Sequence, residues 1–321
     1  MTERDLDALL QQAARRTDGQ YRVVASKAVE GRPLGPFSYY RVRPDDANDT
    51  IPHEHRRSLR GLRVFAAWIN HVDVKSENSL DTLVRNEVGL NVVRHHLIDF
   101  NATLGSAGIG PADRRSGYEY ILDRRPILLS LLTLGRYVRL WLTVQYPGIP
   151  SVGRFHGDRF EPARWKPTFP NRAMLNAQPD DMFWAARRVM AFSNDAIRAV
   201  VATADYSDPR ATEAIVDALI KRRDKVGREW LTGVNPIVDF TIDGGSHLTF
   251  TNAAVTSGVS TPPRSSRVQW FHFDNADDTL TPVGTLNTAD RTCVSLPDDL
   301  RTDTEFIAAD ISAVDPQHLA W

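Results

Sequence analysis

The sequence predicts an α+β fold in which a mostly helical region is followed by a small β-rich module. Two observations favour this class. Apolar residues recur at helical spacing in several segments, most clearly at residues 53–71, 180–192 and 209–232. After residue 235 the pattern changes to short β-prone runs separated by Gly, Pro, Asp and Asn, which is typical of a compact β module.

In the first hundred residues, helices are expected where apolar residues repeat every three or four positions, and strands where β-prone residues alternate with polar ones. The expected elements are a helix at Asp5–Arg16, a strand at Tyr21–Val29, a turn-rich connection at residues 31–36, a long helix at His53–His71, and two strands at Leu80–Val84 and Asn91–Phe100.

The remainder of the chain predicts four helices and then strands. The last helix has a clear start signal, because Asp208 can cap its free N–H groups and Pro209 suits its first turn. The expected helices are Ile127–Val144, Asp180–Phe192, Asn194–Ala204 and Pro209–Thr232, and the expected strands are Val238–Ile242, His247–Thr251, Val268–Phe273 and Glu305–Ile311.

The charge and cysteine content narrow the function classes. The 321 residues include 39 basic and 40 acidic side chains, a net charge of −1 that gives no general attraction to nucleic acid or to an anionic membrane. Cys293 is the only cysteine, so no internal disulfide can form. No apolar run is long enough to span a bilayer, and the polar N-terminus lacks a signal-peptide core. We therefore expect a cytoplasmic protein with no membrane span and no nucleic-acid partner.

The most informative stretch is residues 71–78, His-Val-Asp-Val-Lys-Ser-Glu-Asn, together with Ile98-Asp99-Phe100 at the end of an expected strand. Read as H-x-D-x-K-x-x-N followed by I-D-F, these segments place several polar side chains of different chemistry at fixed spacing. A long apolar helix leads into the first segment, and two strands separate it from the second. This context indicates an ordered site.

Each polar residue of the two segments suits one task in phosphoryl transfer, a reaction that depends on positioning and on charge neutralisation. Asp73 is suited to orient an acceptor hydroxyl and take its proton, and Lys75 to contact the phosphate. Asn78 and Asp99 offer the hard oxygen ligands that Mg²⁺ prefers. We expect Asp73 and Lys75 to be catalytic, Asn78 and Asp99 to bind Mg²⁺, and Lys75, Asn78 and Asp99 to bind ATP.

Residues 71–78 resemble the catalytic loop of protein kinases, whose pattern is H-R-D-L-K-x-x-N, and Asp99-Phe100-Asn101 resembles their D-F-G segment. Residues 64–73, V-F-A-A-W-I-N-H-V-D, are more similar to atypical kinases of the HipA and phosphatidylinositol-kinase type, where an apolar helix enters an N-x-D-x-x-x-x-N loop. The resemblance implies a bacterial branch of that group, acting as an atypical ATP- and Mg²⁺-dependent phosphotransferase on an unknown protein or small-molecule acceptor.

The resemblance also implies a domain organisation. Residues 1–40 would hold an N-terminal helix and a hinge-like strand, the remnant of an N-lobe, with Gly31–Phe37 as the linker beneath adenine. Residues 41–234 would form a mostly helical kinase-like C-lobe with a catalytic-loop hairpin. Residues 235–321 would form the β-rich module, which lies outside the resemblance.

Three departures from the kinase pattern keep a second function class open. Only 70 residues precede His71, with no glycine-rich phosphate loop and with Lys27 as the sole lysine. Asn101 replaces the glycine of D-F-G, and 21 positions separate Asn78 from Asp99. The alternative is a pseudokinase-like binding or scaffolding protein without catalytic activity, and a third hypothesis is a metal-dependent hydrolase that uses Asp73, Asn78 and Asp99.

Polar residues near the loop have simpler expected roles. Asp81 is expected to be a turn or cap group, with a metal or loop-orienting role as the alternative. His95 and His96 are neighbours in an expected strand, so their side chains should point to opposite faces and cannot share one metal ion. His71 is expected to support the loop through a backbone hydrogen bond.

Overall fold

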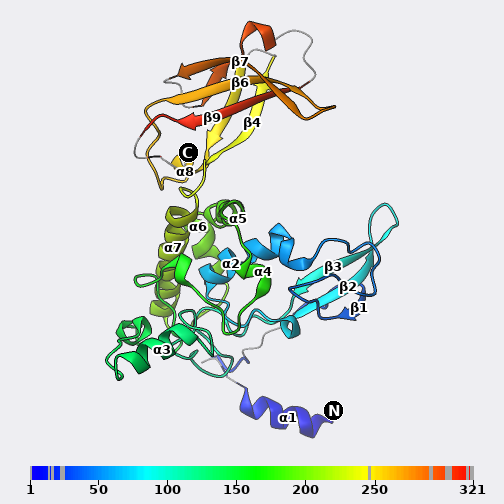
Figure 1. The fold of residues 1–321 in the computed structure, drawn as a ribbon. Coiled ribbons are helices and arrows are strands. Elements are labelled where there is room, and N and C mark those ends of the chain that lie inside the picture. The colour runs from blue at the N-terminus through cyan, green and yellow to red at the C-terminus, as the bar shows by residue number, and fades with distance from the viewer. Residues whose placement is uncertain are drawn as a thin grey trace. The chain divides into compact units, whose positions relative to one another are not determined.

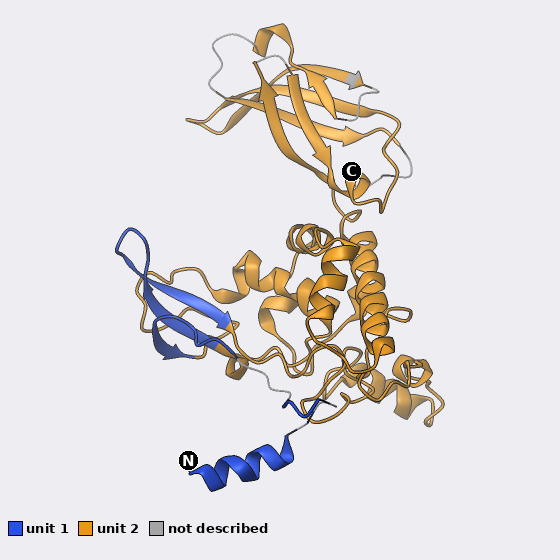
Figure 2. Ribbon diagram, turned by 180° about the vertical axis from the view of Figure 1, so that it is seen from behind, with its two compact units in different colours: residues 1–35, 80–96 blue, residues 36–79, 97–321 orange. Residues whose placement is uncertain are grey.

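The computed structural model describes residues 2–13, 15, 18–21, 26–244, 247–288, 292–300, 306–315 and 318. Within this part of the chain the fold is α+β with small antiparallel sheets, as predicted. The chain forms two compact units, one of residues 1–35 and 80–96 and one of residues 36–79 and 97–321 (Figure 2). The boundaries at residues 40 and 234 divide the chain differently and stay a prediction.

The first unit combines a helix with a three-stranded sheet of order β1-β2-β3 (Figure 1). Helix α1 spans Glu3–Gln12 and begins with a capping box, in which the Thr2 hydroxyl accepts from the Asp5 N–H and the Asp5 carboxylate accepts from the Thr2 N–H. The strands are β1 (Arg32–Gly35), β2 (Ser79–Arg85) and β3 (Asn91–Leu97).

Two expectations for this unit were wrong in part. Residues 22–25 of the expected strand Tyr21–Val29 lie outside the described residues, while residues 26–29 are exposed and form no strand. The expected connection at residues 31–36 contains β1, which pairs antiparallel with β2. Pro33 lacks an N–H, and it fits because β1 is an edge strand.

Asp81 is neither a turn residue nor a cap. It is fully buried in β2, and one of its carboxylate oxygens lies 2.5 Å from Nδ1 of His95 on β3. On the neighbouring position of β2, the Thr82 hydroxyl pairs with Nε2 of His96 at 3.0 Å. Because Asp81 and Thr82 alternate across the sheet, the two histidines point to opposite faces, as the sequence predicted.

The second unit contains the helices that position the candidate site (Figure 1). Helices α2, α5 and α7 pack together, and their small or branched side chains, such as Val64, Ala185 and Val226, are fully buried. The long helices are α2 (Arg57–Ile69), α5 (Pro179–Met190), α6 (Asn194–Ala202) and α7 (Pro209–Trp230); α3 (Arg124–Leu132), α4 (Arg172–Leu175) and α8 (Ala253–Thr256) are shorter; and single 3-10 turns lie at His53–His55, Ser76–Asn78, Leu140–Thr143, Pro162–Arg164 and Asp298–Leu300.

Three of the helices lie close to their expected positions, and the capping signal is confirmed. The Asp208 carboxylate accepts a hydrogen bond from the N–H of Arg210, and Pro209 occupies the first turn of α7. The expected helix at residues 53–71 is interrupted at Arg56, whose backbone is extended, so that α2 begins at Arg57.

The apolar helix expected at Ile127–Val144 is much shorter than predicted. Helix α3 ends at Leu132, because Leu134 and Gly135 adopt left-handed backbone conformations and the Gly135 N–H bonds back to Ser130. The leucines of this segment are largely exposed: Leu128, Leu131, Leu132 and Leu134. This segment therefore does not form the long helix that its apolar run predicted.

Arg222 on α7 ties the end of α2 to the rest of the unit. Its buried guanidinium donates to the carbonyl oxygens of Ala67, Trp68 and His156, at 2.7 Å for Trp68 and 3.0 Å for His156. The guanidinium carbon also lies 3.6 Å from the ring centroid of Phe160. Burial lowers the Arg222 pKa to about 9, which still leaves the group charged at neutral pH. The charge is stabilised by α2 carbonyls at the negative end of the helix dipole.

The C-terminal β-rich module consists of two three-stranded sheets, ordered β4-β5-β8 and β7-β6-β9. Apolar residues from both sheets, including Leu248, Phe250, Val268, Trp270 and Ile311, form one buried cluster, so the sheets pack face to face. The strands are β4 (Ile237–Asp243), β5 (His247–Asn252), β6 (Ser266–Asp274), β7 (Thr279–Thr288), β8 (Cys293–Ser295) and β9 (Ile307–Ala313). The sequence predicted four of them and missed β7 and β8.

Among the described residues, no helix has both the length and the apolar character needed to cross a bilayer.

Replacing Arg222 with Met should lower the free energy of unfolding by about 3 kcal/mol, because buried carbonyl oxygens then lose a charged donor. Urea denaturation measures the change. The matched control is Arg228→Met, an exposed arginine on the same helix, for which we expect a loss below about 0.5 kcal/mol. Equal losses in the two variants would show that Arg222 does not hold α2 in place.

Candidate functional site

The loop that carries the candidate site leaves the C-terminus of α2. Asn70 adopts a left-handed conformation (φ 55°), and the His71 N–H bonds back to the Ala66 carbonyl at 2.8 Å. The Asn70 side-chain oxygen accepts a hydrogen bond from the Trp165 indole at 2.9 Å. Gly117 lies against this oxygen, since a Cβ there would sit only 2.3 Å from it. The direction in which the chain leaves α2 is thus fixed by distant residues.

Backbone hydrogen bonds hold the next residues of the loop from both sides. The Val72 N–H donates to the Ala102 carbonyl at 3.2 Å, and the Val72 carbonyl accepts from the Thr168 N–H at 2.8 Å. The Asn171 side-chain amide donates to the Val74 carbonyl at 3.4 Å. Val72 and Val74 are buried, whereas the Asp73 side chain between them remains 27% exposed. The carboxylate of Asp73 is therefore accessible on a rigid support.

Three of the predicted site residues are brought into direct contact. The Asn78 side-chain amide donates to the Asp73 carboxylate at 2.8 Å and to the Asp73 carbonyl at 2.9 Å. The Lys75 ammonium lies 3.0 Å from the same carboxylate oxygen, Oδ2. Asn78 is buried, and its N–H donates to the Lys75 carbonyl at 3.1 Å. Both side-chain donors meet Oδ2, which leaves Oδ1 of Asp73 available to a further donor.

Asp99, the fourth predicted residue, is returned to the loop by a backbone contact. After Asn78 the chain makes the β2–β3 excursion, and the N–H of Ile98 then bonds the Asn78 carbonyl at 3.2 Å. The Asp99 carboxylate accepts the N–H of Asn101 at 2.9 Å through Oδ1, which orients the side chain in a short turn. The 21 positions between Asn78 and Asp99 therefore form a hairpin whose two ends are held together by the hydrogen bond between Ile98 and Asn78.

His71 connects the two segments. Its ring stacks on that of Phe100, with centroids 5.3 Å apart and an interplanar angle of 30°. Burial lowers the pKa of His71, while the backbone of Ala102 and the charges of Asp73 and Asp99 raise it in part. Both carboxylates are therefore close enough to act on the same imidazole. His71 supports the loop through this stacking contact, and the expected backbone hydrogen bond of its side chain stays a prediction.

The chemistry of the donors fits Mg²⁺. The Nδ2 atom of Asn78 is used for Asp73, which leaves its amide oxygen as a hard ligand, and Asp99 adds a carboxylate. Mg²⁺ usually binds one or two such groups together with water and phosphate oxygens. In the described part of the chain there is no group of three or more His, Cys, Asp or Glu side chains that would hold a metal ion without phosphate.

A groove of about 650 Å³ lies beside the second segment. Phe100 and Asn101 line it, together with the glycine-containing stretches 108–111 and 148–153. Gly105 and Gly153 pack backbone against backbone, since a Cβ on Gly153 would lie 2.3 Å from the Gly105 carbonyl oxygen. The groove thus lies next in the chain to Asp99, at the residues that follow it.

The sequence did not identify the residues that hold the loop in place. These residues lie roughly 40 to 100 positions from their loop partners, and none belongs to a motif with a fixed spacing to His71. They are Gly117, Trp165, Thr168 and Asn171. Their roles depend on the tertiary fold. The contacts among Asp73, Lys75 and Asn78 span at most five positions, so all three residues belong to one short sequence motif, and the sequence could single them out together.

Comparison with known proteins gave no match: no family model, no curated protein sequence and no solved structure is similar to this chain. The interpretation of the site rests on its geometry.

Replacing Asn78 with Asp should destabilise the fold in a pH-dependent way. Two carboxylates would then meet where the 2.8 Å amide contact now lies, and their repulsion would raise the pKa of the pair above its unfolded value. A raised folded pKa means that stability is retained at low pH and lost as the pH increases. We expect a loss of about 2 kcal/mol at pH 7.5 that mostly disappears at pH 4.5.

Urea unfolding in the presence of a chelator, to exclude adventitious metal ions, measures this difference. Asn78→Ala is the matched control, because it removes the same hydrogen bonds without adding a charge and should lose a similar amount at both pH values. A pH-independent loss in Asn78→Asp would contradict the Asp73–Asn78 geometry.

Proposed function

We propose that this protein is an atypical, kinase-like phosphotransferase that uses ATP and Mg²⁺. The observation that carries the proposal is the Asp73 carboxylate, oriented by the Asn78 amide at 2.8 Å and the Lys75 ammonium at 3.0 Å. The return of Asp99 to this loop through the Ile98–Asn78 backbone bond supports it. These residues would transfer the γ-phosphoryl group of ATP to a hydroxyl group.

Asp73 would orient the acceptor hydroxyl and take its proton as the oxygen attacks the γ-phosphorus, while the bond from that phosphorus to the β,γ-bridging oxygen breaks and ADP leaves. The Oδ1 atom of Asp73 is suited to this role because Oδ2 already accepts from Asn78 and Lys75. A hydrogen bond from Asn78 holds the carboxylate in one rotamer, so little reorientation is needed when the acceptor binds.

Lys75 would neutralise charge that builds up on the transferred phosphoryl group, since its side chain is 37% exposed beside Asp73. Asn78 and Asp99 would bind Mg²⁺ through their side-chain oxygens. Bound Mg²⁺–ATP supplies the phosphoryl group and screens its negative charge. Asn101, in the position of the D-F-G glycine, accommodates the turn by donating its N–H to Asp99.

The same proposal includes a kinase-like C-lobe, a relationship to the HipA and phosphatidylinositol-kinase group, and a cytoplasmic location. Packing of the apolar helix α2 directly before the loop supports the C-lobe and the relationship to that group. The single cysteine supports the cytoplasmic location. The acceptor would be a protein or a small molecule, because a kinase-like fold does not select among acceptors.

A second function is favoured by one specific observation. Lys27, the only lysine before the loop, is exposed and lies outside any strand or helix, and no glycine-rich loop precedes His71. The groups that would hold a nucleotide from the opposite side are therefore not supplied by these residues. A pseudokinase-like protein that binds nucleotide or a partner without transferring phosphate is the corresponding alternative.

Replacing Asp99 with Ala should abolish Mg²⁺-dependent binding of ATP and leave the fold intact, because it removes a metal ligand from a partly exposed turn. We expect the dissociation constant of Mg²⁺–ATP to rise more than about tenfold, measured by the thermal shift at a series of ATP concentrations with and without Mg²⁺.

The matched control is Asp274→Ala. The Asp274 carboxylate accepts the N–H of Ala276 at 2.8 Å, so this variant loses the same kind of turn contact far from the loop in sequence. Unchanged affinity in Asp99→Ala would refute the assignment of the site. Transfer of radiolabel from the γ-phosphate, lost in Asp73→Asn, separates the phosphotransferase from the pseudokinase-like alternative, which binds ATP without transfer.

A further inference from the structure

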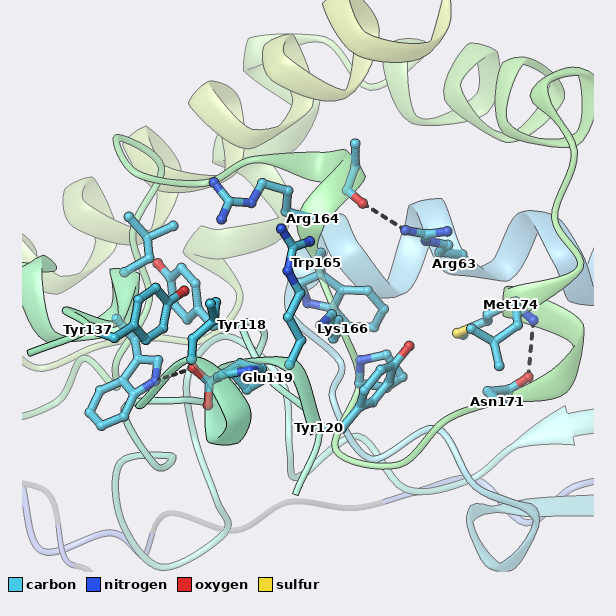
Figure 3. Close-up of a pocket in the computed structure, with 18 residues that line it drawn as sticks. Arg63, Tyr118, Glu119, Tyr120, Tyr137, Arg164, Trp165, Lys166, Asn171 and Met174 are labelled. Atoms are coloured by element: carbon cyan, nitrogen blue, oxygen red, sulfur yellow. Dashed lines mark hydrogen bonds between the residues drawn. The ribbon is translucent and has the colours of Figure 1, made fainter. Parts of the chain in front are cut away.

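A pocket of about 460 Å³ is lined in part by residues that hold the loop 71–78 in place, and it has no role in the proposed phosphoryl transfer. It is lined by α2, by residues between 118 and 141, and by residues 163–175 (Figure 3). Its volume is within the range of pockets that hold small organic ligands. Trp165 and Asn171, two of the lining residues, are those that bond Asn70 and the Val74 carbonyl.

The lining of the pocket carries an excess of positive charge. Among the described lining residues, the cations are Arg63, Arg125, Arg164 and Lys166, and Glu119 is the only carboxylate. Glu119 is already paired, since it accepts from Arg139 at 2.7 Å and from the Trp141 indole at 3.0 Å. The carboxylate therefore does not neutralise the lining cations.

Among the described residues, two of the lining cations, Arg63 and Arg125, have no carboxylate partner; Arg125 is exposed, whereas Arg63 is partly buried. Arg63 lies on α2, and its guanidinium donates to the Ala163 carbonyl at 2.8 Å. In the described part of the chain no carboxylate pairs with it, whereas Lys166 pairs with Asp123 and Arg164 with Glu161. Burial lowers the pKa of Arg63, and the neighbouring Tyr120 opposes the shift. A guanidinium with five donors and one neutral partner retains donors for an anion.

The other walls of the pocket are aromatic. The pocket that Arg63 and Lys166 line is also lined by Tyr118, Tyr120, Tyr137 and Trp165 (Figure 3). Trp141 is a further aromatic lining residue. The Lys166 ammonium lies 5.0 Å from the centroid of the Tyr120 ring, which keeps positive charge and an aromatic face side by side. Flat aromatic walls select a planar group, because stacking and edge contacts depend on ring geometry.

We propose that this pocket binds a small aryl anion, a carboxylate or phosphate attached to an aromatic ring. The anion is held by the Arg63 guanidinium, and the ring lies against the tyrosine and tryptophan side chains. This site is independent of the phosphotransferase proposal, because none of Asp73, Lys75, Asn78 and Asp99 lines it.

Isothermal titration of the full chain with phenyl phosphate, benzoate, inorganic phosphate and benzyl alcohol tests the proposal, without nucleotide or Mg²⁺. Phenyl phosphate or benzoate should bind more tightly than inorganic phosphate or benzyl alcohol, since only the aryl anions use both kinds of wall. Arg63→Gln should weaken binding of the aryl anion about tenfold, and binding should also weaken as salt is added.

Two further variants keep the result interpretable. Arg228→Gln removes an exposed arginine from another helix and should leave binding unchanged, and Tyr120→Leu should weaken the aryl anion but not inorganic phosphate. Asp99→Ala should leave aryl-anion binding unchanged, which separates this site from the proposed nucleotide site. Failure of both aryl anions to bind the native chain, or equal binding in Arg63→Gln and Arg228→Gln, overturns the proposal.

Discussion

The buried guanidinium of Arg222 is the interaction on which the candidate site depends. It joins α7 to the last carbonyls of α2 and to His156, and so fixes the point at which the chain leaves α2 for residues 71–78. A buried charge with no carboxylate partner is costly unless its donors are all satisfied. Here the guanidinium donates to three carbonyl oxygens and lies over two aromatic rings. It also lies at the negative end of the α2 dipole, so its charge is stabilised.

Because the chain leaves α2 in a fixed direction, contacts between residues close in sequence are enough to position the side chains of the candidate site. Asp73, Lys75 and Asn78 contact one another within a single loop, while a backbone bond between Asn78 and Ile98 brings back Asp99 after the hairpin. The same loop is braced by Trp165 and Asn171, which also line the aryl-anion pocket. One scaffold thus presents an acidic site and a cationic pocket, two environments that would attract ligand groups of opposite charge.

The sequence predicted correctly those features that depend on residues close together in the chain. The helical period and the Asp208–Pro209 start signal located α7, and the loop motif singled out Asp73, Lys75 and Asn78, which the structure brings into contact. The sequence did not predict features that depend on contacts between residues far apart in the chain. Strand β7 is mostly exposed and shows no clear apolar alternation, and no local pattern marks Asp81 as a buried strand residue that contacts His95. Gly135, whose left-handed backbone follows the end of α3 at Leu132, is visible in the sequence, but the apolar residues around it led to the prediction of a longer helix.

Replacement of Mg²⁺ by Mn²⁺ offers the most direct measurement of the central claim, that Asn78 and Asp99 bind a metal–nucleotide complex beside Asp73. Paramagnetic Mn²⁺ broadens the amide signals of nearby residues in a nuclear magnetic resonance spectrum. With ATP and Mn²⁺ together, the account predicts broadening of residues 73–78 and 98–101, with the signals of β6 unaffected. Unchanged signals in both loop segments, or broadening centred elsewhere, would contradict it.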